Sequence, residues 1–492
     1  MSRRDILGTL LPGFEGTVLP AWVDGLLREG LGGVCLFGEN VVDTTQLREL
    51  TDAIRAANPD AVIAIDEEGG DVTRLYYDRG APFPGNAVLG RIDDVAATRA
   101  VGAAVGAELR AVGVNLDLAP DVDINSNPLN PVIGVRSFGA APGLVSRHGA
   151  AWTAGLQSQG VAANLKHFPG HGDTAEDSHL ALPSVDVPLE VLRARELQPF
   201  AAAIEAGALT VMTSHVLLPQ VDPVQPATFS PAVLQGLLRG ELGFRGVIVS
   251  DALDMVGASG TIGIPTAAVR ALAAGCDLLC IGTKNTAAQL EEIHDRIAEA
   301  LGSGELPVER LADATVRLRR LAEVLRGWDD SRAVGSETVP APVPVPDAAG
   351  VAASFAMEPA AALALSGPGW VLVRVDTEPN NAIGEVPWDP SPALAAAGVD
   401  LPVFPVSTAG PIERIDHIPP AASVLVVGRD NQRRPVVVHL IDALRARHER
   451  VVTVDLGWPG DDPRYSGIAT YGASALVADA LAAALAERTV RA

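Results

Sequence analysis

The sequence predicts an α/β protein: a large (β/α)₈ TIM-like barrel followed by a smaller C-terminal α/β sandwich domain. Two observations predict the barrel. Eight short, almost wholly apolar runs alternate with Ala- and Leu-rich helical stretches between Ile6 and Gly282, and parallel strands that are buried on both faces have this composition. Most of the runs also end in polar residues, and a barrel of this kind places its active site at the carboxyl ends of its strands. A doubly wound open sheet is the alternative that the pattern leaves open.

The predicted strands lie in eight runs that follow one another at regular intervals. In chain order they are ILGTLLPGF, GGVCLFGEN, AVIAIDEEGG, GVNLDLAPDVD, GVAANLKHFPG, ALTVMTSHV, GVIVSDALDM and GCDLLCIGT. The ionisable residues at or just beyond their ends are Glu39, Asp66, Asp121, Lys166, His215, Asp251 and Lys284.

A proline-rich segment interrupts the alternation and predicts a domain boundary. We expect a catalytic barrel over residues 1–326, an extended linker over 327–347 and a second α/β domain over 348–492, because the Pro-Val-Pro run cannot form a helix. The second domain contains the strand candidates WVLVRVD, SVLVVGRD and VVTVDLG and a terminal helix over Ser474–Glu487.

The composition excludes several classes of partner. The net charge of −23 has no basic run to offset it, which argues against nucleic acid and anionic membranes as partners. The three cysteines fit no zinc motif and favour a reducing compartment. With no segment that resembles a signal peptide or a membrane span, the expected location is the cytoplasm. The oligomeric state is not predicted.

The loop from Lys166 to Pro183, KHFPGHGDTAEDSHLALP, is rich in glycine, acids and histidine and follows an apolar run. Loops of this kind carry movable chemistry in α/β enzymes. Within it, Asp177 and His179 pair a carboxylate with an imidazole that can both give and take a proton near neutral pH.

Each of three further candidates has a structural alternative. Asp251 follows a buried strand and is suited to be a nucleophile, or it caps a helix. Asp66, before paired glycines, can bind a hydroxyl-rich ligand or belong to a solvated turn. Arg136 is either a ligand clamp or a member of a structural ion pair.

The histidines of this region also raise the question of a metal. His171, His179 and His215 lie near acids, as zinc or iron ligands do. Their spacing matches no helical metal motif, and Lys166 adds a positive charge beside the presumed ion. We therefore expect neither a metal nor any other cofactor.

Taken together, these motifs resemble family 3 glycoside hydrolases of the bacterial β-N-acetylglucosaminidase (β-N-acetylhexosaminidase) type. DEEGG-x-V-x-R-L is similar to the family's D-Q-E-G-G segment, NPVIGVRSFG to its arginine segment, KHFPGHGDTAEDSH to its signature loop and SDALDM to its nucleophile segment. The motifs occur in the family's order across roughly residues 5–330.

The resemblance implies a retaining mechanism that uses two groups. Asp251 would attack the anomeric carbon and form a covalent glycosyl-enzyme, and the Asp177–His179 dyad would protonate the leaving oxygen and then activate water. The positions implied to bind the sugar are Asp66, Arg136, Lys166 and His167, with His215 near them. His171 corresponds to a residue that shapes the loop.

The chain departs from the family pattern at three positions. Glu67 stands where relatives often have Gln, Asp71 where they often have Arg, and Val135 where they often have Asp. The first two changes add negative charge beside Asp66, and we expect them to alter what binds beyond the sugar.

The function expected from the resemblance is removal of a terminal N-acetylglucosamine from cell-wall or chitin-derived fragments during recycling. Phosphorolysis at the same site is one alternative, since a neutral imidazole does not repel phosphate as a carboxylate does. A non-catalytic sugar-binding protein is an alternative of another class.

Overall fold

The structure is a computed structural model of the 492-residue chain. It describes residues 1–175, 182–333, 344–364, 369–377, 382–384, 386–408 and 413–489. The chain forms two compact units. Unit 1 comprises Met1–Glu68, Val95–Ile133 and Ala140–Pro344, and unit 2 comprises Gly69–Asp94, Gly134–Gly139 and Val345–Ala492.

Unit 1 is built around an eight-stranded parallel sheet that confirms the predicted barrel. Hydrogen bonds connect its strands in the order β1-β10-β9-β6-β5-β4-β3-β2, and the two end strands, β1 and β2, lie in contact. Every one of the eight apolar runs contains one of these strands. Their bounds are β1 (Leu10–Pro12), β2 (Gly33–Leu36), β3 (Val62–Ile65), β4 (Leu116–Asp117), β5 (Ala162–Phe168), β6 (Thr210–Thr213), β9 (Val247–Ser250) and β10 (Leu278–Gly282).

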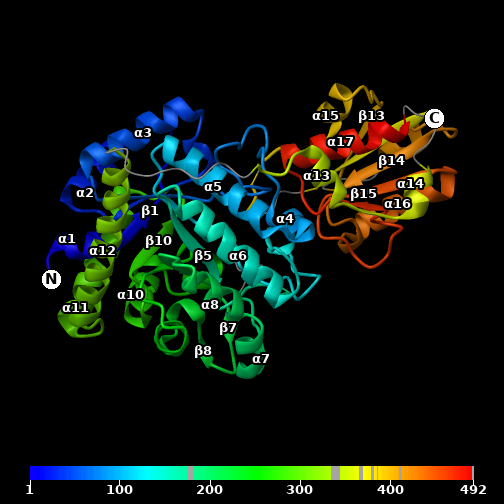
Figure 1. Ribbon diagram of the computed structural model, residues 1–492. Coiled ribbons are helices and arrows are strands. Elements are labelled where there is room, and N and C mark those ends of the chain that lie inside the picture. The colour runs from blue at the N-terminus through cyan, green and yellow to red at the C-terminus, as the bar shows by residue number, and fades with distance from the viewer. Residues whose placement is uncertain are drawn as a thin grey trace. The chain divides into compact units, whose positions relative to one another are not determined.

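Helices alternate with these strands and surround them in Figure 1. They are α1 (Arg3–Leu7), α2 (Ala21–Glu29), α3 (Thr44–Ala57), α5 (Val95–Ala111), α6 (Pro142–Gln157), α7 (Leu189–Ala194), α8 (Leu197–Glu205), η4 (Ala232–Glu241), α9 (Val256–Ser259), α10 (Ile264–Ala274), α11 (Ala287–Ser303) and α12 (Val308–Ala333). A short antiparallel pair, β7 (Leu217–Leu218) and β8 (Asp222–Pro226), lies outside the barrel sheet.

The barrel interior is a packed core. Alternate residues of the strands, such as Ala64, Val249 and Cys280, belong to one buried apolar cluster, as the two-residue period of a strand requires. Leu321 and Leu325 of α12 join the same cluster. Each fully buried valine or leucine of this cluster contributes roughly 1.5–3 kcal/mol to folding, so the interior stabilises the frame on which polar residues at the strand ends are held.

Unit 2 contains a six-stranded sheet in the order β11-β16-β15-β14-β12-β13, in which only β11 runs antiparallel to its neighbour. Without β11, the order is that of a doubly wound α/β domain, 2-1-3-4-5 along the chain. The strands are β11 (Ala356–Met357), β12 (Trp370–Asp376), β13 (Val403–Ser407), β14 (Ser423–Gly428), β15 (Val451–Asp455) and β16 (Ile468–Ala469). The helices are α4 (Asn86–Ile92), α13 (Ala348–Ala353), α14 (Pro359–Ala364), α15 (Ser391–Ala396), α16 (Pro435–Arg447) and α17 (Ala475–Thr489). The predicted second α/β domain is thereby confirmed.

The boundaries within the chain differ from those we predicted. Helix α12 continues to Ala333, so the first residues of the predicted linker, from 327 on, are helical. Two segments assigned from the sequence to the barrel belong to unit 2. Val88 packs in the core of that unit with Leu372 and Leu425, which explains why its segment clusters there.

Asp71, one of the departures from the family pattern, is bound within unit 2. Its carboxylate lies 2.6 Å from the Arg429 guanidinium and accepts the Ala473 N–H at 2.7 Å, and both charged side chains are nearly buried. The negative charge that Asp71 adds is therefore offset by Arg429. The expectation that this position alters what binds beyond the sugar stays a prediction.

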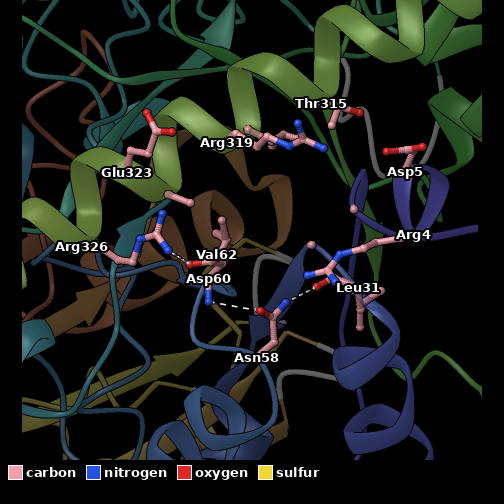
Figure 2. Close-up of a pocket in the computed structure, with 15 residues that line it drawn as sticks. Arg4, Asp5, Leu31, Asn58, Asp60, Val62, Thr315, Arg319, Glu323 and Arg326 are labelled. Carbon is pink, nitrogen blue, oxygen red and sulfur yellow. Dashed lines mark hydrogen bonds and ion pairs between the residues drawn. The ribbon is translucent and has the colours of Figure 1, made fainter. Parts of the chain in front are cut away.

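A pocket of about 300 Å³ lies at the amino-terminal ends of β2 and β3 (Figure 2). Gly32, Val62 and residues of α12 line it, and Arg326 pairs with Asp60 at 2.9 Å on one side. The candidate site residues come at the carboxyl ends of the same strands, so this pocket is at the wrong end of the barrel for them. Polar residues at that end of such barrels generally serve stability.

Among the residues that the structure describes, no helix combines the length and the apolar character needed to cross a lipid bilayer.

Candidate active site

Asp251 directly follows strand β9 and is partly exposed. Its N–H donates to Thr213 Oγ1 at 3.3 Å, and its Oδ1 accepts the Ala252 N–H at 2.8 Å. The next helix, α9, has Met255 at its N-cap. Asp251 therefore does not cap this helix, which removes the structural alternative that the sequence left open. A carboxylate fixed at the end of a rigid strand is well placed to act as a nucleophile.

Lys166 joins the end of β5 to the end of β3. Its Nζ lies 2.7 Å from Asp66 Oδ1 and 2.7 Å from Glu68 Oε1, and its side chain is almost completely buried. One ammonium group thus offsets two carboxylates, of which Asp66 keeps a fifth of its side chain exposed. Ionised carboxylates accept hydrogen bonds from hydroxyl groups, so Asp66 is suited to hold a sugar hydroxyl.

A further acid, Asp117, contacts the same acidic segment. Asp117, at the end of β4, is fully buried, and its Oδ1 accepts the Glu67 N–H at 3.0 Å. Burial raises the pKa of Asp117 well above its ordinary value, and the nearby charge of Glu67 acts in the same direction. Burial therefore disfavours the charged form of this carboxyl group.

His167 lies in a network centred on Asp123. Its Nδ1 is 2.7 Å from Asp123 Oδ2, and the same carboxylate accepts the backbone N–H of His171 at 2.7 Å. The register of β5 against β6 shifts between Leu165 and Phe168, so the strict alternation of side chains ends there. Lys166 and His167, although adjacent, both enter polar networks at this end of the strand.

His171 is a buried, neutral imidazole. Burial and the neighbouring His167 lower the pKa of His171 to about 4, and its Nδ1 lies 2.9 Å from Thr174 Oγ1. Its ring packs edge-to-face against that of His167 with centroids 5.9 Å apart. These contacts support the expected role in shaping the loop.

Asp121, Asp123 and His167 bring three possible metal-ligand atoms within 4.8 Å of one another. However, the 2.7 Å between His167 Nδ1 and Asp123 Oδ2 is a hydrogen-bond distance, and the Asp123 carboxylate also accepts backbone N–H groups. We interpret the cluster as a hydrogen-bonded network that orients His167.

His215 is fully buried beside the candidate nucleophile. Its Nδ1 lies 2.9 Å from Thr228 Oγ1, and its Nε2 donates to the Ala252 carbonyl at 3.0 Å. Both ring nitrogens are thus engaged within the protein. His215 thus contacts the backbone of the residue that follows Asp251, and its expected place near the sugar-binding residues stays a prediction.

Arg136 belongs to unit 2. It ends the short η2 helix (Gly134–Arg136) and is largely buried, and its carbonyl accepts a hydrogen bond from Asn86 Nδ2 at 2.6 Å. The asparagine holds the backbone of the arginine segment in place. Asp177 and His179, the predicted acid/base dyad, lie outside the described residues.

Participants that were not singled out from the sequence include Glu68, Asp117, Asp123 and Thr213. Glu68 follows Asp66 in the acidic run, and Asp123 ends the run GVNLDLAPDVD. Polar residues at strand ends were the available signal, but which of several neighbouring acids faces the site depends on backbone turns that the sequence pattern does not specify.

Comparison with known proteins identifies the family. Residues 21–321 match the model described as the glycosyl hydrolase family 3 N-terminal domain. The chain belongs to glycoside hydrolase family 3. This confirms the resemblance seen in the motifs, and the protein is accordingly a glycoside hydrolase.

The family 3 chain is similar to proteins named for one activity. It is 38% identical over 350 residues to β-hexosaminidase A of Pseudoalteromonas piscicida, a match that covers 66% of this chain but only 58% of that relative. It is 42% identical over 279 residues to a β-hexosaminidase of Xanthomonas axonopodis pv. citri, covering 55% of this chain and 83% of the relative.

Solved structures extend the family 3 similarity to the whole chain. A glycoside hydrolase family 3 β-N-acetylglucosaminidase from Paenibacillus sp. str. FPU-7 matches with a TM-score of 0.87 and 32% identity, over 99% of this chain and 97% of that one. NagZ from Neisseria gonorrhoeae, in complex with N-trifluoroacetyl-D-glucosamine, matches with a TM-score of 0.55 and 33% identity, over 66% of this chain and 96% of that one.

Proposed function

We propose that the protein is a retaining exo-β-N-acetylglucosaminidase that removes terminal N-acetylglucosamine from cell-wall or chitin-derived fragments in the cytoplasm. The observation that carries this proposal is the position of Asp251, partly exposed and rigidly held at the carboxyl end of β9. The similarity to proteins named β-hexosaminidase and β-N-acetylglucosaminidase supports the choice of sugar.

In the proposed reaction, Asp251 attacks the anomeric carbon as the bond to the leaving oxygen breaks, and a covalent glycosyl-enzyme forms. The imidazole of His179, oriented by Asp177, gives its proton to the leaving oxygen. It then takes a proton from the water that releases the sugar. This second step restores Asp251 as a carboxylate and gives a product with the original β-configuration.

The binding roles that we propose follow from the contacts of each residue. Asp66, held by Lys166 at 2.7 Å, accepts hydrogen bonds from sugar hydroxyls. Lys166 and His167 are held in polar networks at the end of β5, from which they bind further sugar hydroxyls. The binding role of Arg136 rests on the resemblance, and its guanidinium is always charged. His215 Nε2 donates a hydrogen bond to the Ala252 carbonyl at 3.0 Å and so helps to fix the backbone next to the nucleophile.

Trapping the intermediate tests the proposal. A slow substrate, 5-fluoro-N-acetylglucosaminyl fluoride, should leave one fluorinated sugar on the peptide that contains Asp251, as detected by mass spectrometry. Asp251→Ala should give no adduct and lower kcat/KM for an aryl β-N-acetylglucosaminide by about 10³-fold or more. Asp254→Asn, which changes a neighbouring carboxyl that accepts the Thr283 N–H, should still form the adduct. An adduct on another residue would contradict the assignment.

The two other functions give different results in the same assays. Phosphorolysis requires that added phosphate raise the initial rate and yield a sugar 1-phosphate, whereas we expect phosphate to have no effect. A sugar-binding protein would bind N-acetylglucosamine without any turnover of the aryl glycoside.

A comparison of leaving groups tests the dyad. His179→Ala should slow substrates with poor leaving groups far more than activated aryl glycosides, which depart without a proton. Asp177→Ala should show part of the same effect. Equal losses on both kinds of substrate would show that His179 is not the proton donor.

A further inference from the structure

Asp123 forms hydrogen bonds with both His167, near the end of β5, and His171, in the loop that follows. It lies just beyond β4, is completely buried, and accepts hydrogen bonds from three groups: His167 Nδ1 at 2.7 Å, the His171 N–H at 2.7 Å and the His167 N–H at 3.3 Å. Its own N–H donates to Asp121 Oδ1 at 2.9 Å. The carboxylate therefore ties the end of β5 to the first residues of the glycine-rich loop.

The charge of this carboxylate determines the state of the ring beside it. Burial alone would raise the pKa of Asp123, but the imidazole of His167 and the donors around it hold that pKa below its ordinary value. An ionised carboxylate only accepts hydrogen bonds, so the hydrogen must be on His167 Nδ1. This leaves Nε2 as the ring nitrogen that can engage a sugar hydroxyl.

We propose that Asp123 is a positioning residue for the reaction: it fixes the orientation and the protonated nitrogen of His167, through which it acts on the sugar. The inference rests on the proposed function, in which His167 binds a sugar hydroxyl. His171 contributes from the other side, since its Nδ1 is bound to Thr174 and its backbone to Asp123.

Replacement of the carboxylate by its amide isolates this effect. In Asp123→Asn, the amide oxygen can still accept the His171 N–H, but the amide nitrogen facing His167 Nδ1 is a donor. The ring must then carry its hydrogen on Nε2. We expect kcat/KM for an aryl β-N-acetylglucosaminide to fall by about 10- to 100-fold, the size of effect that loss of a charge-assisted hydrogen bond produces.

A double-mutant cycle separates positioning from general support of the fold. If Asp123 acts through His167, the double variant Asp123→Asn/His167→Ala should be no worse than His167→Ala alone. Losses that multiply would overturn the proposal. The matched control is Thr98→Val, which removes another buried hydrogen bond to a histidine, between Thr98 Oγ1 and His148 Nδ1 at 2.7 Å, and should leave kcat/KM unchanged.

Substrates that lack one hydroxyl give a readout that a merely structural role would not move. Among the 3-, 4- and 6-deoxy aryl glycosides, the one that lacks the hydroxyl bound by His167 should be cleaved equally well by wild type and Asp123→Asn. Uniform losses on all three would contradict the proposal.

A spectroscopic test is independent of turnover, so it distinguishes failure of this inference from failure of the proposed function. The ¹⁵N chemical shifts of the His167 ring should show hydrogen on Nδ1 in the wild type and a loss of that hydrogen in Asp123→Asn. The same Nδ1–H state in both proteins would overturn the proposal even if the enzyme were active.

Discussion

Asp123 in unit 1 and Asp455 in unit 2 are fully buried carboxyl groups near the carboxyl ends of parallel strands. The pKa of Asp123 is nevertheless lowered from its ordinary value, whereas that of Asp455 is raised. Asp455 accepts backbone N–H groups from Asp430 at 2.8 Å, Asn431 at 3.0 Å and Gly457 at 2.8 Å. Burial and the neighbouring Asp430 nevertheless raise the pKa of Asp455 to about 7. Asp123, which faces an imidazole, has its pKa lowered.

The difference shows what a buried carboxylate needs in order to stay ionised. Backbone donors satisfy the hydrogen-bonding capacity of Asp455, but they carry only partial charges and do not offset its burial. The ring of His167 donates directly to Asp123 at 2.7 Å. A buried carboxylate suited to orienting a catalytic ring therefore needs a side-chain donor of this kind as well as backbone N–H groups.

Replacement of His167 should have the largest effect on stability. It leaves Asp123, like Asp455, a buried carboxyl group that accepts backbone N–H groups, without the side-chain donor of His167. The pKa of Asp123 is lowered in the folded protein. Its contribution to stability is therefore fully present at pH values above its ordinary pKa of 3.8 and is lost as the pH falls through the lowered pKa. In His167→Ala, burial should instead raise that pKa. We expect the free energy of unfolding to fall by about 3 kcal/mol at pH 8 and by less at pH 5, where Asp123 can take up a proton. Urea denaturation at the two pH values measures this, and equal losses would contradict the comparison.

His171 should give a comparable effect on the acid side. Its folded pKa of about 4 lies below the ordinary value of 6.5, so the unfolded chain binds a proton first as the pH falls. Its contribution to stability is therefore lost between pH 6.5 and pH 4, by up to roughly 3 kcal/mol. Denaturation midpoints across that range should fall less steeply for His171→Asn than for wild type. Parallel curves would show that His171 titrates normally.

Asp455→Asn should have a smaller effect, with the opposite pH dependence to that of His167→Ala. The raised pKa of Asp455 makes unit 2 less stable as the pH rises from about 4 to 7, because the folded state holds the proton that the unfolded state releases. The amide should cost about 1–2 kcal/mol at pH 5, through its mismatched donor, and less at pH 8. Hydrogen exchange of the β15 amides checks this, and a cost that grows with pH would refute it.

The smallest effect is expected at the surface. Asp24 pairs with Arg28 at 2.8 Å one helical turn away, and both side chains are exposed. Solvent screens such pairs, so Asp24→Ala should leave the denaturation midpoint unchanged at both pH values. A clear shift would show that burial is not what sets Asp123 and Asp455 apart from a surface carboxylate such as Asp24.

The sequence predicted the barrel well because its strands are buried on both faces and so read as apolar runs. Strand β13 was not predicted because Pro405 interrupts VFPVS. Proline is tolerated there because β13 lies at the edge of its sheet. Strand β16 has only two residues, too few for a pattern. The predicted linker began at residue 327, whereas helix α12 continues to Ala333; Leu321 and Leu325 of this helix pack in the barrel core.

The candidate site was predictable in its residue types and less so in its pairings. Asp251, Asp66 and Lys166 stand at strand ends, where the pattern marks them. The partner of His167 lies 44 residues away along the chain, and no local pattern selects Asp123 over Asp121. Likewise, only packing shows that the segment of Arg136 belongs to unit 2.

The binding of Asp71 within unit 2 has a consequence for synthesis of the chain. Its partner Ala473 is 402 residues further on. At typical rates of about 5–20 residues per second, roughly 20–80 s pass between the emergence of the two from a ribosome. During that interval the early segment must wait, exposed, for the strand and helix that will enclose it. A nascent chain released before residue 473 would keep this segment open to proteases and chaperones.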